Sequence, residues 1–375
     1  VERVQERLSL ARKLLEKAQK RGRMTADKAE AMLGLIKTTT EYADLEGCDL
    51  VIEAVFEHRD IKAEVTAKTE AVIPETAIFA SNTSTLPITG LAEASKRPQS
   101  FIGIHFFSPV DKMPLVEIIV GEKTSQEAIA RSMDYVQQIR KTPVVVNDSR
   151  GFYTSRCFGM YPNEGITMLA EGVNPALIEN AAKMAGMPVG PLAVSDEVTI
   201  ELQYKIMAQH KKDLGDDWVK PSSYDAVTRF VEDLDRKGKR FGKGFYDYPE
   251  SEKKHLWGEL GTIFPAAAEQ PSVDEVQKRL LYIQSLETAR CIEEGVVTEA
   301  ADADIGSILG WGFPPWTGGT ISLIDTIGIA RFVAECERLA DAYGERFRPS
   351  PWLKAKAENN ESFYGETAEN ARSAA

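Results

Sequence analysis

This chain of 375 residues is poor in the features that mark secreted, membrane-spanning and zinc-binding proteins. It has four cysteines, Cys48, Cys157, Cys291 and Cys336, and no two of them stand in a C-x-x-C spacing. The sequence therefore predicts no disulfide framework and no metal site, and it fits a reducing, cytoplasmic compartment. No apolar run approaches the roughly 18 residues that span a bilayer, and no secretory signal peptide is visible, so we expect any membrane association to be peripheral.

The chain also lacks an excess of positive charge. The formal net charge is −12, and the Lys and Arg residues are not gathered in one run. A nucleic-acid-binding protein needs a basic footprint, so this class is disfavoured, although one small basic patch for a phosphorylated ligand is not excluded. The hydrophobic fraction of 43% and the charged fraction of 27% are ordinary for a globular protein, and the length predicts roughly two or three domains. The chain opens with Val1 inside a helical pattern, so we interpret it as a fragment or as the ordered part of a longer protein.

The first part of the chain alternates short apolar segments with amphipathic ones. The apolar segments predict strands at 48–55, 77–80, 101–107, 115–120 and 143–147. The amphipathic segments predict helices at 2–22, 26–36, 58–71, 87–95 and 125–140. This alternation is typical of an α/β domain with a mainly parallel sheet, which we place at residues 1–148.

The rest of the chain has an almost entirely helical pattern and contains an internal sequence repeat. Leu169-Ala-Glu-Gly172 is followed by Gly186-Met-Pro188, and Ile292-Glu-Glu-Gly295 is followed by Gly312-Phe-Pro314. Each copy has the pattern of a long helix, a glycine stop, a second helix and a Gly/Pro loop, which indicates a duplication. We therefore predict a first helical domain at 149–250, a linker at 251–272, a second helical repeat at 273–358 and a flexible tail at 359–375.

His105 and Glu117 are candidates for a catalytic pair. His105 ends a predicted strand, and Glu117 lies twelve residues later on the next one. Ligands bind beyond the carboxyl ends of the strands in a parallel α/β sheet, so His105 stands where chemistry usually occurs. A carboxylate hydrogen-bonded to one imidazole nitrogen would leave the other nitrogen as a general base. On spacing alone, a buried structural histidine beside an edge carboxylate remains the alternative.

Polar residues also follow two other predicted strands. The turn Ser81-Asn-Thr-Ser-Thr85 could hold a substrate oxygen, and it could also cap the helix that follows, with Pro87 in the first turn. Glu57 and, five residues later, Lys62 form either a candidate site or a solvated helix start. No G-x-G-x-x-G stands at a strand-to-helix turn, so spacing alone does not indicate a nucleotide-dependent enzyme.

Three segments together resemble the L-3-hydroxyacyl-CoA dehydrogenase family: Ala80–Thr89, His105–Ile119 and Lys141–Phe152. Two further segments, Asp49–Glu57 and Gly242–Tyr248, also match. The likeness covers nearly the whole chain, and its His-Phe-Phe-x-Pro sequence, with a Glu twelve residues after the His, is specific. Because the helical part is duplicated, the chain resembles in particular the dehydrogenase part of the multifunctional α-subunit of bacterial fatty-acid-oxidation complexes.

The resemblance implies a Rossmann-type, mainly parallel sheet followed by a duplicated all-α domain. It implies that the first βα unit, with the glycine-rich turn and the acidic ribose contact, lies upstream of Val1, as would an enoyl-CoA hydratase domain. The implied cofactor is NAD, although the residues present do not decide between NAD and NADP because the ribose-reading residue would also lie upstream. The implied substrate is an acyl-CoA, and the implied partner is a 3-ketoacyl-CoA thiolase subunit in a hetero-oligomer.

Site residues of the family map onto positions of this chain. The resemblance implies that His105 is the general base that removes the 3-hydroxyl proton, and that Glu117 orients it and stabilises its charge. Ser84 would bind the substrate and lie near the nicotinamide. Glu57 and Lys62 would contact the cofactor.

Three further positions match less closely. Arg240 falls near a family lysine at the nucleotide site, so it is a candidate cofactor contact. The family commonly has Asn where this chain has Ser108 and Ser155, and we place Ser108 among the cofactor contacts and Ser155 among the catalytic residues. Serine keeps a hydroxyl but loses the reach of an amide, so a contact through water would replace a direct one. The change would cost on the order of 10–100-fold in rate, or nothing where water substitutes fully.

The resemblance thus favours an NAD-dependent oxidoreductase of fatty-acid β-oxidation, which oxidises the 3-hydroxyl group of an L-3-hydroxyacyl-CoA to a ketone. Two alternatives remain. One is a 3-hydroxybutyryl-CoA-type dehydrogenase of another pathway. The other is a non-catalytic scaffold whose helical repeats dock a thiolase.

Overall fold

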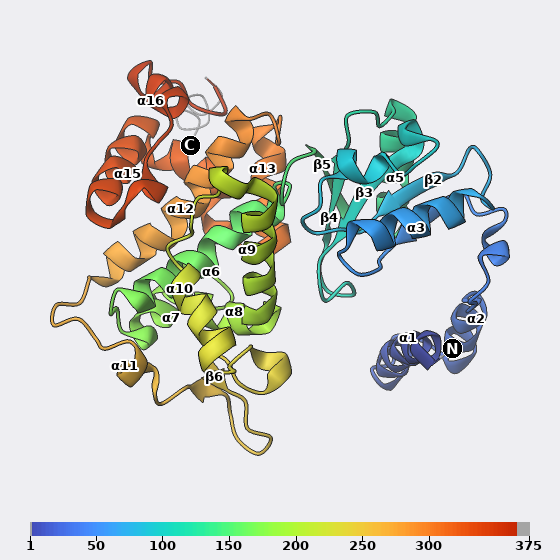
Figure 1. Cartoon of the computed structure of the whole chain (residues 1–375), viewed down its shortest axis with the longest axis horizontal. Coiled ribbons are helices and arrows are strands. Elements are labelled where there is room, and N and C mark those ends of the chain that lie inside the picture. The colour runs from blue at the N-terminus through green and yellow to red at the C-terminus, as the bar shows by residue number, and fades with distance from the viewer. Residues whose placement is uncertain (1, 366–375) are drawn as a thin grey trace.

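The structure is a computed structural model that describes residues 2–365. Figure 1 shows two bodies side by side: a sheet flanked by helices, formed by the first part of the chain, and a larger all-helical body formed by the rest. This arrangement confirms the predicted fold class, an α/β part followed by a helical part. Among the described residues, no helix combines the length and apolar character needed to cross a bilayer.

The sheet body contains all five of the strands predicted from the sequence, with bounds that differ from the predicted ones by at most two residues at either end. The strands are β1 (Leu50–Glu53), β2 (Ile78–Ser81), β3 (Phe101–Phe106), β4 (Leu115–Val120) and β5 (Thr142–Asn147). The helices are α1 (Glu2–Lys20), α2 (Ala26–Gly34), α3 (Arg59–Glu70), α4 (Ile88–Ala92) and α5 (Gln126–Gln138). Helices α1 and α2 form a hairpin that stands apart from the sheet at the N-terminal end (Figure 1).

The five strands form one sheet in the order β1-β2-β3-β4-β5. All neighbouring strands are parallel except β3 and β4, which are antiparallel, so the prediction of a mainly parallel sheet is confirmed. The antiparallel register places His105 directly opposite Glu117. Side chains of directly opposed residues lie on the same face of a sheet and close together. The register therefore brings the two predicted catalytic residues into contact.

The two faces of the sheet have different neighbours. On one face, the apolar residues of β2, β3 and β4 pack with Ala128 and Val136 of α5 in a small core. The other face, which includes Phe101 and Leu115, belongs to a large core shared with the helical body. Side chains alternate between the faces of a strand, so His105 and Glu117 lie on the face that meets the helical body.

The helical body consists of two successions of helices. The first contains α6 (Thr154–Ala170), α7 (Pro175–Met184), α8 (Pro191–Val198), α9 (Ile200–Leu214) and α10 (Tyr224–Thr228), which a π-helical turn continues over Arg229–Asp233. The second contains α12 (Val273–Glu293), α13 (Ala300–Trp311), α14 (Thr320–Ile327), α15 (Ile329–Tyr343) and α16 (Pro351–Glu358). Helices α6 and α12 pack against each other in the middle of the body (Figure 1).

Equivalent polar contacts in both successions support the predicted duplication. Glu179 on α7 accepts hydrogen bonds from backbone N–H groups at the start of α8, and Asp304 on α13 does the same at the start of α14. Asp196 on α8 accepts from the backbone of a Phe-Tyr pair at 245–246, and Asp325 on α14 accepts from the Phe-Tyr pair at 363–364. The same acid-to-backbone contacts thus recur in the same order.

Two boundary predictions need correction. The expected linker at 251–272 contains β7 (His255–Leu256), which pairs with β6 (Tyr246–Asp247), and α11 (Leu260–Ile263), whose Leu260 is buried. The expected flexible tail does not begin at 359, because Asp325 holds the backbone of Phe363 at 3.0 Å. Residues 366–375 of that tail lie outside the described residues. The charge and proline content of these segments did not indicate the β6–β7 pairing or the contact of Phe363 with Asp325.

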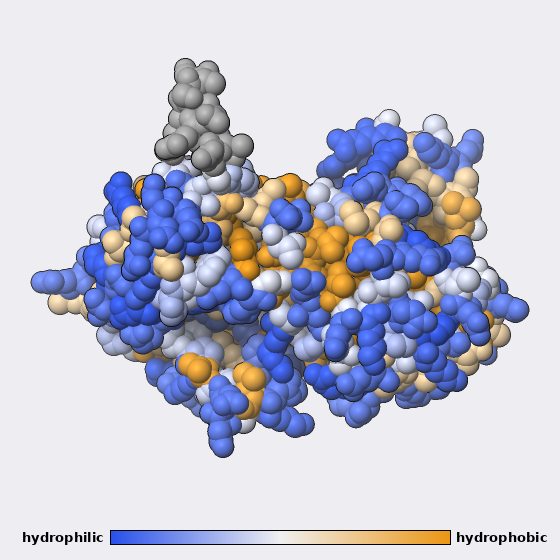
Figure 2. Space-filling model, turned by 90° about the horizontal axis from the view of Figure 1, so that it is seen from above, coloured by the Kyte–Doolittle hydropathy of each residue, from blue (hydrophilic) through white to orange (hydrophobic). Residues whose placement is uncertain are grey.

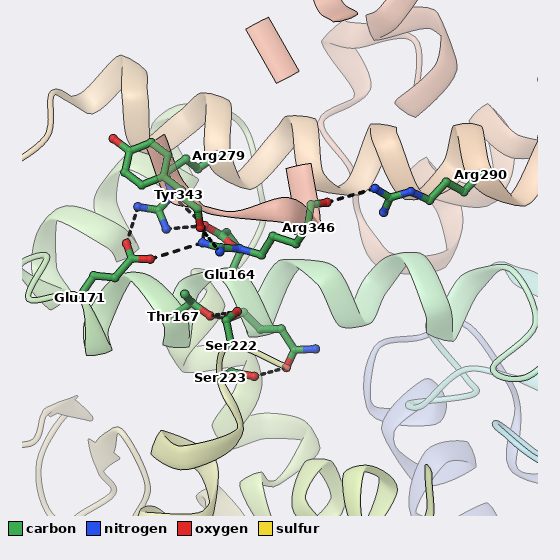
Figure 3. A network of polar contacts seen from close by, with 10 residues as sticks. Glu164, Thr167, Glu171, Ser222, Ser223, Arg279, Arg290, Tyr343 and Arg346 are labelled. Carbon is green, nitrogen blue, oxygen red and sulfur yellow. Dashed lines mark hydrogen bonds and ion pairs between the residues drawn. The ribbon is translucent and has the colours of Figure 1, made fainter. Parts of the chain in front are cut away.

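A buried ionic network joins the two helical successions. Glu164 on α6 accepts from Nε of Arg279 on α12 at 2.7 Å and from Nε of Arg346 at 2.6 Å. Glu171, at the C-terminal end of α6, accepts from Nη1 of Arg279 at 2.6 Å, and the Arg279 guanidinium lies over the ring of Tyr343. Figure 3 shows these side chains converging between α6 and α12. The network ties the successions together through the buried pair of Glu164 and Arg279, while Glu171 and Arg346 lie at its partly exposed edge.

Candidate active site

His105 and Glu117 form a buried hydrogen-bonded pair at the junction of the two bodies. Nδ1 of His105 lies 3.0 Å from Oε2 of Glu117. Glu117 is completely buried and His105 is 5% exposed, so the ring reaches the surface only at its edge. The rings of Phe107 and Phe152 lie 4.7 and 6.2 Å from the imidazole, between centroids, and limit the access of water.

The first turn of α6 holds the Glu117 carboxylate. Oε1 accepts from the backbone N–H groups of Tyr153 and Thr154, each at 3.0 Å. Oε2 accepts from the Thr154 hydroxyl at 2.6 Å as well as facing Nδ1 of His105. An ionised carboxylate offers about four acceptor positions, and four donors point at this one. The start of a helix favours a negative charge, so the donors around Glu117 suit a carboxylate group.

This environment determines what the imidazole can do. Because the Glu117 carboxylate only accepts, Nδ1 of His105 must carry the hydrogen of their shared bond. Nε2 is then the acceptor nitrogen of a neutral ring, and it makes no hydrogen bond to any of the described residues. The pair therefore has the form of a general base with its orienting carboxylate. The alternative of a purely structural histidine does not explain the unpartnered Nε2.

The hydroxyl-rich turn after β2 is organised by Glu57. Oε1 of Glu57 accepts from the backbone N–H of Ser84 at 3.1 Å and of Thr85 at 3.3 Å, and from the Thr83 hydroxyl. Ser84 is exposed, and its own hydroxyl has no hydrogen bond within the described part of the chain. The turn is thus fixed while one hydroxyl remains available to a ligand.

The interpretation of this turn as a helix cap is wrong. The N-terminal N–H groups of α4 are instead capped by Asp148, which accepts from Ile88 at 2.9 Å and from Thr89 at 2.7 Å. Pro87 stands at the N-cap position and offers no side-chain cap. Asp148 follows β5, sixty residues away from the helix that it caps, so local sequence patterns could not reveal it.

Lys62 is buried in an ion pair. Its Nζ lies 2.8 Å from Oε1 of Glu53, at the end of β1, and 3.5 Å from Oε2 of Glu57. The side chains of Lys62 and Glu53 are each 2% exposed, and the Ser81 hydroxyl also donates to Glu53. The charge of Lys62 is therefore held within the protein, where it positions Glu57. Glu53 and its buried pair with Lys62 were not among the predicted site residues.

Asn82 is another residue that sequence reasoning did not select. Its Oδ1 accepts from the backbone N–H of Phe106 at 2.8 Å. Phe106 directly follows His105, so this bond joins the turn that carries Ser84 to the end of the strand that carries the base. Only the position of Asn82 inside a polar turn could have suggested this role.

The remaining predicted site residues are less closely associated. Ser155 lies in the first turn of α6, next to the Thr154 that contacts Glu117, and is half-buried. Ser108 is exposed in the loop that leaves β3, three residues after His105. Arg240 is exposed in a short helical turn (Lys239–Phe241) of the helical body, and no hydrogen bond or ion pair links it to Ser84. The candidate catalytic residues thus lie near one another in the structure, whereas no hydrogen bond or ion pair among the described residues links Arg240 to them.

The residues present fit the nicotinamide end of a dinucleotide. Glu57 and Ser84 lie together where β1 and β2 end, which is where a parallel sheet binds its ligands. The Ser84 hydroxyl is exposed and unpaired there, close to the strand end that carries His105. No cluster of three or more His, Cys, Asp or Glu that could hold a metal ion occurs among residues 2–365.

Burial keeps the hydroxyl of Tyr153 protonated. The side chain is fully buried, which raises the pKa of Tyr153 well above its ordinary value. Its hydroxyl donates to the backbone carbonyl of Ala303 on α13 at 2.6 Å. The residue whose N–H supports Glu117 is therefore anchored to the second helical succession.

Known protein families match both bodies. Residues 1–149 match the NAD binding domain of 3-hydroxyacyl-CoA dehydrogenase, and residues 151–248 match its C-terminal domain. The two matches meet at residue 150, between β5 and α6.

Individual relatives agree with these matches. The chain is 41% identical over 363 residues to the fatty acid oxidation complex subunit alpha of Shewanella amazonensis, and 41% identical over 361 residues to that of Shewanella oneidensis. Each alignment covers 95% of this chain but only 50% of the relative, so the chain spans about half the length of these alpha subunits.

Two solved structures are similar over most of the chain. The dehydrogenase part of multifunctional enzyme 1 from Caenorhabditis elegans has a TM-score of 0.63 and 27% identity, and covers 91% of this chain and 79% of that one. The 3-hydroxybutyryl-CoA dehydrogenase of Escherichia coli has a TM-score of 0.81 and 23% identity, covers 96% of this chain and 92% of that one, and shows a shared fold. With two matching domain families and a buried histidine–glutamate pair in place, the chain belongs to the 3-hydroxyacyl-CoA dehydrogenase family.

Proposed function

We propose that the protein oxidises the 3-hydroxyl group of an L-3-hydroxyacyl-CoA to a ketone with NAD as the cofactor, as a step of fatty-acid β-oxidation. The single observation that carries this proposal is the His105–Glu117 pair, with four donors around the carboxylate and an unpartnered Nε2. Membership of the dehydrogenase family supports the reaction type.

Each residue of the site has a proposed task. Nε2 of His105 takes the proton of the substrate hydroxyl, and Glu117 stabilises the imidazolium that forms. The bound nicotinamide supplies the hydride acceptor. The Ser84 hydroxyl orients the substrate oxygen toward Nε2, while Glu57, fixed by Lys62, holds the turn that carries Ser84.

The cofactor and substrate contacts of the less closely associated residues remain part of the proposal. We assign Ser155 to the substrate side of the site because it adjoins the turn that binds Glu117. Ser108 and Arg240 are assigned to the cofactor because of the family positions that they match, Arg240 falling near a family lysine at the nucleotide site. Figure 2 shows apolar surface where the two bodies meet, which suits the aliphatic part of an acyl-CoA.

The test uses the full-length protein and measures NADH formation from L-3-hydroxyacyl-CoA substrates. His105→Gln should abolish turnover without lowering the melting temperature, because the amide cannot act as a base. His255→Gln is the matched control, since His255 is exposed on β7 in the helical body. Wild-type turnover in His105→Gln would exclude His105 as the base, and no turnover in the wild type would favour a scaffold.

We further propose that the chain acts within a multifunctional complex that includes a thiolase. Support comes from its 41% identity to a fatty acid oxidation complex subunit alpha. A chain-length series of acyl-CoA substrates separates this role from that of a 3-hydroxybutyryl-CoA dehydrogenase, which would turn over only the shortest one. Co-purification of the full-length protein with a 3-ketoacyl-CoA thiolase tests the partner.

A further inference from the structure

We propose that the Thr154 hydroxyl is a positioning group that sets how readily the His105–Glu117 pair takes up a proton. This inference deepens the proposed dehydrogenase function and rests on it. The starting observation is that two donors share one carboxylate oxygen: Oε2 of Glu117 accepts from the Thr154 hydroxyl at 2.6 Å and faces Nδ1 of His105 at 3.0 Å. The hydroxyl contact is the shorter of the two.

Packing against α13 holds the Thr154 side chain in this orientation. Thr154 is 1% exposed, and its methyl group faces Gly310 of α13, where an added Cβ would lie 3.6 Å from Cγ2. The same Cβ would lie 3.0 Å from Cδ2 of Leu115, so α13 packs tightly against this part of the site. The bond from the Tyr153 hydroxyl to Ala303 fixes the preceding residue on the same helix. The hydroxyl is thus directed at Glu117 by packing.

Among the described residues, the hydrogen bonds to Glu117 come from no ionisable side chain other than His105. On β5, the residue opposite Glu117 is Val144. From α6, the carboxylate receives two backbone N–H groups and the Thr154 hydroxyl, and the Tyr153 hydroxyl points away to α13. On β3, only His105 bonds to it. Within the described residues, His105 is therefore the one titratable side chain in hydrogen-bond contact with Glu117.

The chemical consequence follows from this sharing. A hydroxyl that donates to Oε2 draws negative charge toward itself and leaves less of it for the imidazolium. Without the hydroxyl, Glu117 would stabilise protonated His105 more strongly. The base would then remain protonated, and so inactive, up to a higher pH. Thr154 thus keeps His105 neutral, and able to accept the substrate proton, over a wider range of pH.

The test compares four full-length variants by the pH dependence of kcat/KM for hydroxyacyl-CoA oxidation. Thr154→Val keeps the shape but removes the hydroxyl, and should move the midpoint of the acidic limb upward by about 0.5 to 1 pH unit. Thr154→Ser keeps the hydroxyl and should restore the wild-type midpoint. Thr154→Ala, matched to Ser in lacking the methyl, should shift like Val. Thr288→Val removes a buried hydroxyl that bonds to Gln284 and Cys157 but not to Glu117, and should leave the profile unchanged.

A second readout does not need activity. Titration of the His105 ring, followed by NMR of the protein without substrate, should show the same upward shift in Thr154→Val and Thr154→Ala and none in Thr154→Ser. Equal titration curves in all four proteins would overturn the proposal. An absence of dehydrogenase activity in the wild type would instead refute the proposed function, and the NMR titration would still decide the role of Thr154.

Discussion

Replacement of Glu117 by Gln tests the central claim about the site, that this carboxylate fixes the tautomer of His105. The substitution keeps the size of the side chain but changes its hydrogen-bonding capacity. Four donors converge on Glu117, from His105, Tyr153 and two groups of Thr154. A Gln amide has one oxygen that can accept two of them, and its NH2 group presents two more donors.

The expected loss of activity follows from the orientation that the introduced Gln amide group must adopt. The two backbone N–H groups of α6 cannot move, so the Gln oxygen faces them and its NH2 faces His105. Nδ1 must then accept, and the hydrogen moves to Nε2, which can no longer act as a base. The equivalent loss of the correct tautomer in a serine-protease triad lowers kcat by about 10⁴-fold, and we expect a loss on the order of 10³–10⁴-fold here.

The assay is single-turnover NADH formation by the full-length protein, with thermal unfolding measured in parallel. Glu117→Asp is the control that keeps the charge on a shorter side chain and should be less damaging than Gln. A Gln variant that keeps more than a tenth of wild-type turnover, with its melting temperature unchanged, would show that the tautomer argument is incorrect. The ring tautomer itself can be read from the nitrogen chemical shifts of His105.

Three further outcomes are expected. Glu164→Gln removes the buried negative charge shared by Arg279 and Arg346 and should lower the free energy of unfolding by roughly 3–5 kcal/mol, measured by denaturant titration. The control Glu201→Gln breaks only a pair with the exposed Lys205 and should change the free energy of unfolding little. Burial raises the pKa of Asp196 from 3.8 to about 6, so between these pH values the folded protein keeps a proton that the unfolded chain releases. The melting temperature should therefore fall as the pH rises from about 4 to 6, and Asp196→Asn should remove this part of its pH dependence. Gly306→Ala places a Cβ 2.7 Å from the Tyr153 ring and should cost about 1–3 kcal/mol and reduce turnover; an unchanged melting temperature would contradict the close packing.

The parts of the site that the sequence predicts correctly depend on local order along the chain. The spacing of His105 and Glu117, on two successive apolar segments, predicts two neighbouring strands, and their antiparallel register brings the side chains together. The position of the turn at 81–85 after a strand predicts its place at the ligand-binding edge. Both results follow from strand periodicity and from the rule for the carboxyl ends of parallel strands.

The parts that the sequence does not predict depend on contacts between distant segments. Asp148 caps α4 from sixty residues away, and Lys62 turns inward because Glu53 is buried beside it. Thr154 contacts Glu117 only because α6 starts beneath β4. In each case the identity of a polar residue indicates that it needs a partner, but not which partner tertiary packing provides.

The bond between the Tyr153 hydroxyl and Ala303 also bears on the order of folding. It spans 150 positions of the chain, and the neighbouring bond from Asn147 to Gly295 spans 148. Contacts of such long range close late, because the loop entropy must be lost before the contact forms. During synthesis at roughly 5–20 residues per second, the base and its carboxylate are made about 10–40 s before α13 can bind the start of α6 at Tyr153. A nascent chain that stops before α12 would carry every proposed catalytic residue, but α13 would not yet have fixed their geometry.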